Sequence, residues 1–198
     1  MHKIVAIDKH VFKLINYNWH NNFFDFIMPW LRNAEMWSPF YFFLILIMTV
    51  NYKKSGWWWV AFFIATVVIT NYISSNIIKE HIARVRPCNN PEFAGWIRVL
   101  VGYLPMNSSF VSSHAANHFG LAMFSYLSLK KEFGKWIVLF FVWAFAISYA
   151  QIYVGVHYPI DVVGGTFVGL FFGYITGKLF NNYFGLRQPE TELSVGAN

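Results

Sequence analysis

Three polar clusters interrupt a chain that is otherwise mostly apolar, and their residue types suit phosphate chemistry. They lie at residues 79–87, 112–118 and 151–161, where hydrophobic stretches begin or end. Ionisable groups at membrane depth are costly, so by default they indicate a functional site. Together the clusters supply cations, helix-terminal backbone amides, histidines and a carboxylate. This inventory is sufficient for phosphoryl transfer.

The first cluster offers cations for an anionic group. Lys79 ends an apolar stretch, and Arg86 precedes Pro87, which disfavours helix in the residue before it. We therefore expect Arg86 on an extended or turning segment. A lysine contributes a point charge, whereas the arginine fork can bind phosphate oxygens at two points. Taken alone, the cluster is equally compatible with charges that snorkel from a helix end.

The second cluster marks the start of a helix. Ser112, Ser113 and His114 open an apolar stretch, and a serine at that place caps free backbone amides. The same amides and the helix dipole form an anion site, beside which His114 could protonate a leaving oxygen. Capping alone is the simpler alternative, but two serines followed directly by a histidine favour function.

The third cluster places an imidazole and a carboxylate four residues apart. Asp161 is the only carboxylate between Glu132 and Glu190, and an unpaired charge at the edge of an apolar stretch is costly. A bond to His157 would offset this cost and fix the imidazole tautomer, leaving the other ring nitrogen free as a nucleophile. The alternative is a hydrogen-bonded pair that only pins two helices together.

A metal site is a further alternative. His114 and His118 would share a helix face, as zinc-binding histidines often do, and His157 and Asp161 could complete four ligands. Against this, the cations of the first cluster would repel a divalent metal ion and attract an anion. No glutamate follows His114, so the zinc-protease pattern is absent.

The elements that must position these clusters are membrane helices. Of 198 residues, 57% are hydrophobic and 12% are charged, about half the charged fraction of an ordinary soluble domain. The stretches long and apolar enough to cross a bilayer are Met36–Tyr52, Trp57–Ile78, His114–Leu129, Lys135–Tyr153 and Asp161–Phe180. The predicted fold class is therefore all-α, an integral membrane bundle of about five transmembrane helices.

The first 35 residues follow a different pattern. Ile4, Ile7 and Val11 recur at helical spacing with charged residues between them, which is typical of an amphipathic helix lying at the membrane interface. A sixth span over Phe23–Leu31 is an alternative, although it would contain Asp25. The length allows one domain, predicted as an interfacial segment, a transmembrane bundle and a cytoplasmic tail at residues 1–35, 36–181 and 182–198.

Loop charges predict the orientation of the bundle. In a five-span bundle one side would collect Lys53, Lys54, Lys130, Lys131, Lys135 and Lys178. The positive-inside rule places that side in the cytoplasm, so all three clusters would face the outer side. The net charge of +6 does not indicate nucleic acid, because the basic residues lie in short loops that meet lipid headgroups. No protein partner is indicated, and the single cysteine excludes an internal disulfide.

Together the clusters resemble the three signatures of the type 2 phosphatidic acid phosphatase (PAP2) superfamily: Lys-x6-Arg-Pro, Pro-Ser-Gly-His and Ser-Arg-x5-His-x3-Asp. Residues 79–87 fit the first signature completely. Residues 112–114 are similar to the second, with Val111 in place of proline and Ser113 in place of glycine. The resemblance spans about residues 57–180.

The third signature is matched in part. His157 and Asp161 fit its end, but Gln151 and Ala150 stand where arginine and serine are usual. Glutamine can donate a hydrogen bond to phosphate but brings no charge, so transition-state stabilisation should be weaker unless another cation substitutes. Losing one such contact costs about 2–4 kcal/mol. The candidate substitutes are Arg84 and Arg98.

The resemblance implies a role for each matched residue. His157 would attack phosphorus to form a phosphohistidine, Asp161 would orient it, and His114 would protonate the leaving group. The residues that would bind the phosphoryl oxygens are Lys79, Arg86, Ser112, Ser113 and Gln151. Water would then release inorganic phosphate. The resemblance implies no metal and no organic cofactor.

The expected activity is hydrolysis of a lipid phosphate or diphosphate in the bacterial inner membrane, at an active site that faces the periplasm. Undecaprenyl diphosphate, phosphatidylglycerol phosphate, phosphatidic acid and lipid A all stay open as substrates. Two rivals stay open, the first of them motivated by Gln151. One is a non-catalytic or weakly active lipid-phosphate binding or transport protein, and the other is a lipid phosphotransferase that uses the same site.

Overall fold

The computed structural model describes residues 2–187, and within them the chain is helical without any β-strand. The helices are α1 (His2–Lys13), α2 (Asn22–Leu31), α3 (Ser38–Tyr72), α4 (Lys79–His81), α5 (Ser113–Phe133), α6 (Leu139–Tyr153) and α7 (Pro159–Tyr183). A π-helical segment, Ile73–Ile78, joins α3 to α4 without a break. The predicted cytoplasmic tail, residues 182–198, lies mostly outside the described residues.

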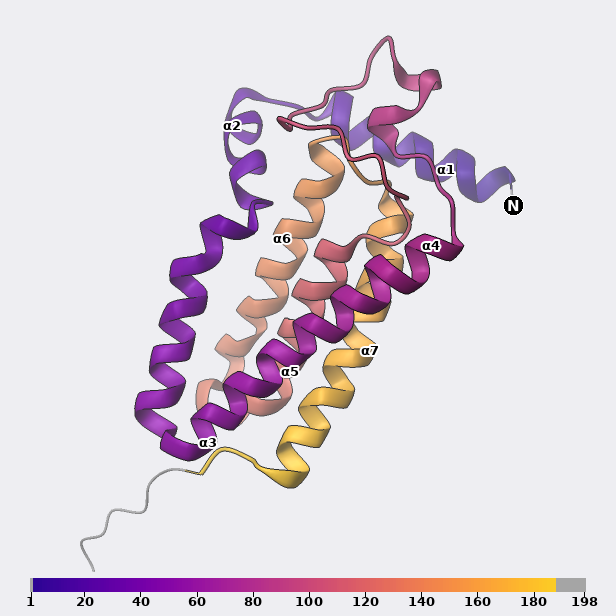
Figure 1. Cartoon of the computed structure of the whole chain (residues 1–198). Helices are drawn as coiled ribbons and strands as arrows, with labels where there is room; N and C mark the ends of the chain where they lie inside the picture. Colours follow the sequence, from indigo (N-terminus) through magenta and orange to yellow (C-terminus); the bar gives the residue numbers. More distant parts are fainter. Residues whose placement is uncertain (1, 188–198) are drawn as a thin grey trace, which may run out of the picture.

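Three helical runs are long and apolar enough to cross a membrane: Ala34–His81, Ser113–Tyr153 and Pro159–Tyr183. The first two each fold into a pair of antiparallel arms (Figure 1). They reverse at Lys53, with φ 49°, and at Gly134, with φ 54°, a left-handed conformation that glycine adopts without strain. The five resulting arms lie at the five predicted stretches. The number of arms that cross the bilayer stays a prediction.

The arms bury an aromatic core and expose apolar side chains outward. The largest fully buried members of the core are Trp59, Phe124, Phe180, Met48 and Leu121. On the outside, Phe42, Trp57, Phe145, Phe167 and Phe171 are all more than half exposed. Soluble monomers rarely expose apolar surface on this scale. These side chains are suited to contact with lipid.

Close packing of α5 against α7 depends on glycines spaced four residues apart on α7. A Cβ atom at Gly165, Gly169 or Gly173 would lie 2.3 Å from a backbone oxygen of Ser112, Ala116 or Gly120 respectively. Small residues at this spacing let membrane helices approach backbone to backbone. The N-terminal ends of α5 and α7 are thereby held side by side, and each carries one of the polar clusters.

The N-terminal segment covers one end of the bundle (Figure 1). Helix α1 exposes Ile4 and Ile7 but buries Asp8 and Phe12. The predicted helix is therefore present, but the side that packs on the protein is not the side that carries Ile4 and Ile7. Asp8 faces inward, where it pairs with Arg84 and accepts a backbone N–H. Helix α2, where a sixth span was the alternative, has 10 residues, about 15 Å of helix against a hydrocarbon core of about 30 Å. It is not among the three runs long and apolar enough to cross, and the number of spans stays a prediction.

The two ends of the bundle differ in chemistry. The lysine-rich turns at residues 53–54 and 130–135 lie at the same end as the C-terminus of α7 (Figure 1). The long loop over residues 82–112 and the α6–α7 loop over residues 154–158 lie at the other end, the end that also carries α1. The prediction that the three clusters share one end is confirmed. The side of the membrane that this end faces stays a prediction.

Candidate active site

The centre of the polar end is Asp161, whose side chain is completely buried. Its Oδ2 accepts the Tyr158 backbone N–H at 2.8 Å and the Ser109 hydroxyl, and its Oδ1 accepts from the Arg84 guanidinium. Asp161 stands in the first turn of α7, where the helix dipole also favours a negative charge. The compensation that the sequence assigned to His157 alone therefore comes mainly from Arg84, Ser109 and the backbone.

His157 lies against this carboxylate on the α6–α7 loop. Its Nδ1 is 3.5 Å from Asp161 Oδ2, too long for a formed hydrogen bond, and this nitrogen has no partner among the described residues. Such contacts often tighten only when substrate binds. Burial lowers the pKa of His157 to about 4, and Arg86 opposes its protonation further. The ring is therefore neutral near pH 7.

Gly155 shapes the loop that presents His157. Its φ is 88°, and a Cβ there would lie 2.5 Å from the Arg98 carbonyl oxygen. Both the conformation and the close approach require glycine. The backbone N–H of His157 then donates to the Gln151 carbonyl at 3.2 Å, which ties the loop to the end of α6.

Arg86 contacts the other ring nitrogen of His157. Its Nη1 is 3.1 Å from His157 Nε2 and donates to the Val156 carbonyl at 3.0 Å. Its Nε and Nη2 donate to the Asn107 backbone and side chain at 3.0 and 2.8 Å. Arg86 has extended backbone, φ −69° and ψ 153°, as Pro87 predicts. A guanidinium can only donate, so Nε2 of His157 accepts a hydrogen bond from Arg86.

The N-terminus of α5 completes the cluster. Ser112 is its N-cap, and the Ser112 hydroxyl accepts the Ala115 N–H at 3.4 Å. Lys79 reaches this helix from the end of the preceding arm, and its Nζ donates to the Ser113 hydroxyl at 2.9 Å. His114 follows in the first turn and lines a hollow of about 540 Å³. Lys79 and Arg86 line a second hollow of about 440 Å³.

Gln151 is buried at the end of α6, and its amide is only half satisfied. Its Oε1 accepts from Arg32 Nε at 3.2 Å, while its Nε2 has no partner among the described residues. Arg32 directly follows α2 and lines the same hollow as His114.

Neither arginine that the sequence offered as a substitute cation is free for that role. Arg84 bridges Asp8 and Asp161, and its guanidinium stacks 4.2 Å from the Tyr158 ring. Burial alone would lower the pKa of Arg84, but the two carboxylates raise it. Arg98 pairs with Asp25. Both charges are neutralised by aspartates, which corrects the sequence-based candidates.

The geometry does not bring together the four side chains of the alternative zinc site. His118 directs Nδ1 to the His114 carbonyl at 2.7 Å and Nε2 to the Tyr41 hydroxyl at 3.3 Å. Among residues 2–187, no three His, Cys, Asp or Glu side chains are grouped as metal ligands would be. His118 belongs to the packing of α5 instead, with its ring 4.8 Å from that of Trp143.

The family model of the PAP2 superfamily matches residues 56–184 of this chain, a range that contains all three polar clusters. The chain belongs to the PAP2 superfamily. The fitting signature residues, far apart in sequence, are the ones that the fold gathers at one end of the bundle.

Named relatives and a solved PAP2-like structure agree with this assignment. A lipid A 4'-phosphatase of Bacteroides thetaiotaomicron is 32% identical over 160 residues, 79% of this chain and 69% of that protein. One of Porphyromonas gingivalis is 31% identical over 117 residues, 58% of this chain and 48% of that protein. The crystal structure of Aquifex aeolicus LpxE has a TM-score of 0.62 at 25% identity, covering 89% of this chain and 96% of that one.

These similarities confirm the all-α fold class and a multi-pass membrane protein. The chain spans about half the length of the Porphyromonas gingivalis relative.

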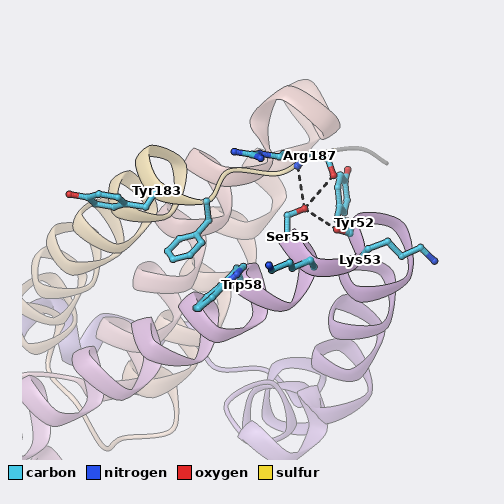
Figure 2. Close-up of a pocket in the computed structure, with 8 residues that line it drawn as sticks. Tyr52, Lys53, Ser55, Trp58, Tyr183 and Arg187 are labelled. Carbon is cyan, nitrogen blue, oxygen red and sulfur yellow. Dashed lines mark hydrogen bonds between the residues drawn. The ribbon is translucent and has the colours of Figure 1, made fainter. Parts of the chain in front are cut away.

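The end of the bundle opposite the PAP2 signatures carries a hollow of similar size, about 530 Å³. Figure 2 shows it between the α3 turn and the end of α7, with the Ser55 hydroxyl bonded to backbone groups of Tyr52 and Arg187. Trp58 stacks on Phe184 there, with ring centroids 4.2 Å apart. No signature residue lines this hollow, so it offers none of the chemistry described above.

Several residues that build the candidate site escaped the sequence reasoning. Asp8, Arg32, Asn107 and Ser109 lie outside the PAP2 signatures. Their contacts are with partners at least 21 positions away. One weak signal existed for Asp8, because a carboxylate in an otherwise basic amphipathic helix requires a partner when it is buried.

Proposed function

We propose that the chain is a lipid phosphatase that works through a phosphohistidine at His157. One observation carries the proposal: the neutral, buried imidazole has a carboxylate at Nδ1 and a guanidinium at Nε2. With the proton on Nδ1, held toward Asp161, the lone pair is on Nε2, where it accepts from Arg86; it would be released for attack when a phosphoryl group takes over the Arg86 donor. Arg86 beside it would hold the phosphoryl oxygens during that attack.

The chemistry follows from these positions. Nε2 of His157 would attack phosphorus, and the bond from phosphorus to the lipid oxygen would break as His114, protonated beside the negative charge of the bound phosphate, gives that oxygen a proton. Asp161 would stabilise the positive charge that forms on the ring. Water would then attack the phosphohistidine with His114 as base, releasing inorganic phosphate and restoring the neutral ring. Throughout, Lys79, Arg86 and the α5 amides would offset the phosphoryl charge.

The substrate that we propose is a lipid phosphomonoester of the lipid A type. Two relatives are named lipid A 4'-phosphatases, and the site opens at the end of an apolar bundle where a lipid headgroup would lie. Undecaprenyl diphosphate, phosphatidylglycerol phosphate and phosphatidic acid are the competing substrates. We place the protein in the bacterial inner membrane with the site on the periplasmic side, because the lysine-rich turns occupy the opposite end.

The test is phosphate release from those four lipids by the purified protein in detergent, compared with His157→Ala. A matched control is His10→Ala, which removes an exposed histidine of α1. We expect release from at least one lipid, its loss in His157→Ala, and no change in His10→Ala. Lack of turnover on every lipid, or equal turnover by His157→Ala, overturns the proposal. Lipid-phosphate binding without turnover would instead indicate the non-catalytic binding protein.

A further inference from the structure

The clearest departure from the PAP2 signatures is the neutral Gln151 at the usual position of an arginine, and an arginine from another element contacts it. Arg32 Nε donates to Gln151 Oε1 at 3.2 Å. The two residues are 119 positions apart. An uncharged signature residue is thus paired in space with a cation that the signature does not contain.

The chemistry of the two groups fixes how Gln151 points. A guanidinium N–H can only donate, so it must face the amide oxygen and not the amide nitrogen. The Nε2 of Gln151 is thereby turned away from Arg32. It is buried and has no partner among residues 2–187. A buried donor left unpaired is costly, and a phosphoryl oxygen in the site would satisfy it.

The position of Arg32 suits a cation that serves the site. It follows the last residue of α2, where the helix dipole favours positive charge. The Leu31 carbonyl accepts the Trp37 indole N–H at 2.9 Å, which holds this turn in place. Arg32 lines the hollow that also holds His114. Its Nη groups make no hydrogen bond or ion pair within the described part of the chain.

The other cations near the site are committed elsewhere. Arg84 and Arg98 are held by aspartates. Arg86 contacts Asn107, Val156 and His157, and it occupies its own signature position rather than that of the missing arginine. Arg32 is half-buried and forms no ion pair in the described chain, although Glu35 lines the same hollow, so its Nη groups stay available to a ligand.

We propose that Arg32 and Gln151 act as a pair that replaces the missing signature arginine: Gln151 Nε2 donates to a phosphoryl oxygen, and Arg32 supplies the positive charge. The inference rests on the proposed function, because it names binding residues for the same phosphoryl group. It also separates this chain from PAP2 proteins with the usual arginine, in which one side chain would provide both the charge and the donor.

The test exchanges the two side chains. Arg32→Gln should lower kcat/KM by about 100- to 1000-fold, the effect of removing one strong donor to a developing charge. Arg32→Lys should recover part of the loss, since a point charge replaces the fork. Arg32→Gln combined with Gln151→Arg should recover most of it by restoring the arginine at the signature position. The matched control is Arg187→Gln at the opposite end of the bundle, which should behave as wild type.

A binding measurement keeps the inference separate from the phosphatase proposal. Orthovanadate mimics the transferring phosphoryl group, and we expect Arg32→Gln to weaken its binding at least 10-fold, with recovery in the double variant. Wild-type turnover that Arg32→Gln leaves unchanged overturns the inference while the proposed function stands. If wild type turns over no lipid, unchanged vanadate affinity in Arg32→Gln also overturns it. Circular dichroism and thermal melting of each variant identify any that fails to fold.

Discussion

Replacing Asp161 by asparagine changes one atom, and the structure predicts a large effect. Both carboxylate oxygens accept: Oδ1 from Arg84, and Oδ2 from Ser109 and the Tyr158 backbone N–H. An asparagine must turn its NH2 group toward one of these donor sets, so a donor faces a donor in either orientation. It also leaves His157 without the charge that selects its tautomer and stabilises its positive form.

The magnitude follows from these contacts. An amide in place of the carboxylate of a buried triad lowers kcat by about 10⁴-fold when the tautomer is lost. At 1.36 kcal/mol per tenfold, about 10³- to 10⁴-fold corresponds to about 4–5.5 kcal/mol of barrier. Breaking a buried ion pair from one side also costs about 3–5 kcal/mol of stability. We expect the lower end, because the Arg84 side chain is 23% exposed and keeps Asp8.

The assay is phosphate release at saturating lipid, together with thermal unfolding in the same detergent. Glu92→Gln is the matched control, since it makes the same chemical change in an exposed ion pair with Lys9; exposed pairs contribute about 0–1 kcal/mol. We expect Asp161→Asn to lose at least 10³-fold in kcat and Glu92→Gln to lose nothing. An Asp161→Asn protein that folds and retains kcat within about 10-fold of wild type would refute the reasoning, because one hydrogen bond of ordinary strength would then account for the whole effect.

Three further predictions follow from other contacts. Because the pKa of His157 is lowered to about 4, kcat/KM should fall on the acid side near pH 4, and a fall near pH 6.5 would contradict this. The same shift predicts that the contribution of His157 to folding stability is complete above pH 6.5 and declines as the pH falls toward 4. Gly169→Ala should lower the melting temperature, because its Cβ would lie 2.3 Å from the Ala116 backbone oxygen. Gly95→Ala has open space around it and should leave the melting temperature unchanged. Equal melting temperatures of the two variants would show that α5 and α7 can move apart without loss of stability. Asp8→Asn should weaken the ion pair with Arg84 and lower the free energy of unfolding by about 1–3 kcal/mol. Thermal unfolding measures this, with the exposed His10→Ala variant as reference. No change would mean that Asp161 alone fixes the position of Arg84.

Much of the candidate site could be predicted because phosphate chemistry needs particular side chains at particular spacings. A histidine and a carboxylate four residues apart, a serine-capped helix start and a Lys-x6-Arg-Pro segment were each visible without any coordinates. The five apolar stretches were also visible, because a bilayer sets both the length and the composition of a helix that enters it. The lysine-rich turns then placed the three clusters at one end, which the structure confirms.

The sequence could not show which charges neutralise one another. Arg84 and Arg98 were candidates for a catalytic cation because both lie near the first cluster in sequence, yet aspartates from α1, α2 and α7 hold them. Asp8 belonged to a helix that predicts only a membrane-surface role, and it proved to be buried beneath the site. Ion pairs of this kind join residues more than 70 positions apart, and no local pattern encodes them.

The sequence by itself determined which polar groups this protein has for phosphate chemistry, the helices that carry them and the end of the bundle where they gather. Only the tertiary structure decided which cation lies beside the position of the missing signature arginine. Gln151 stands in the signature, but the cation beside it, Arg32, comes from the end of a separate helix. The physical reason is that electrostatic stabilisation depends on the distance between charges in space, and the fold alone sets that distance.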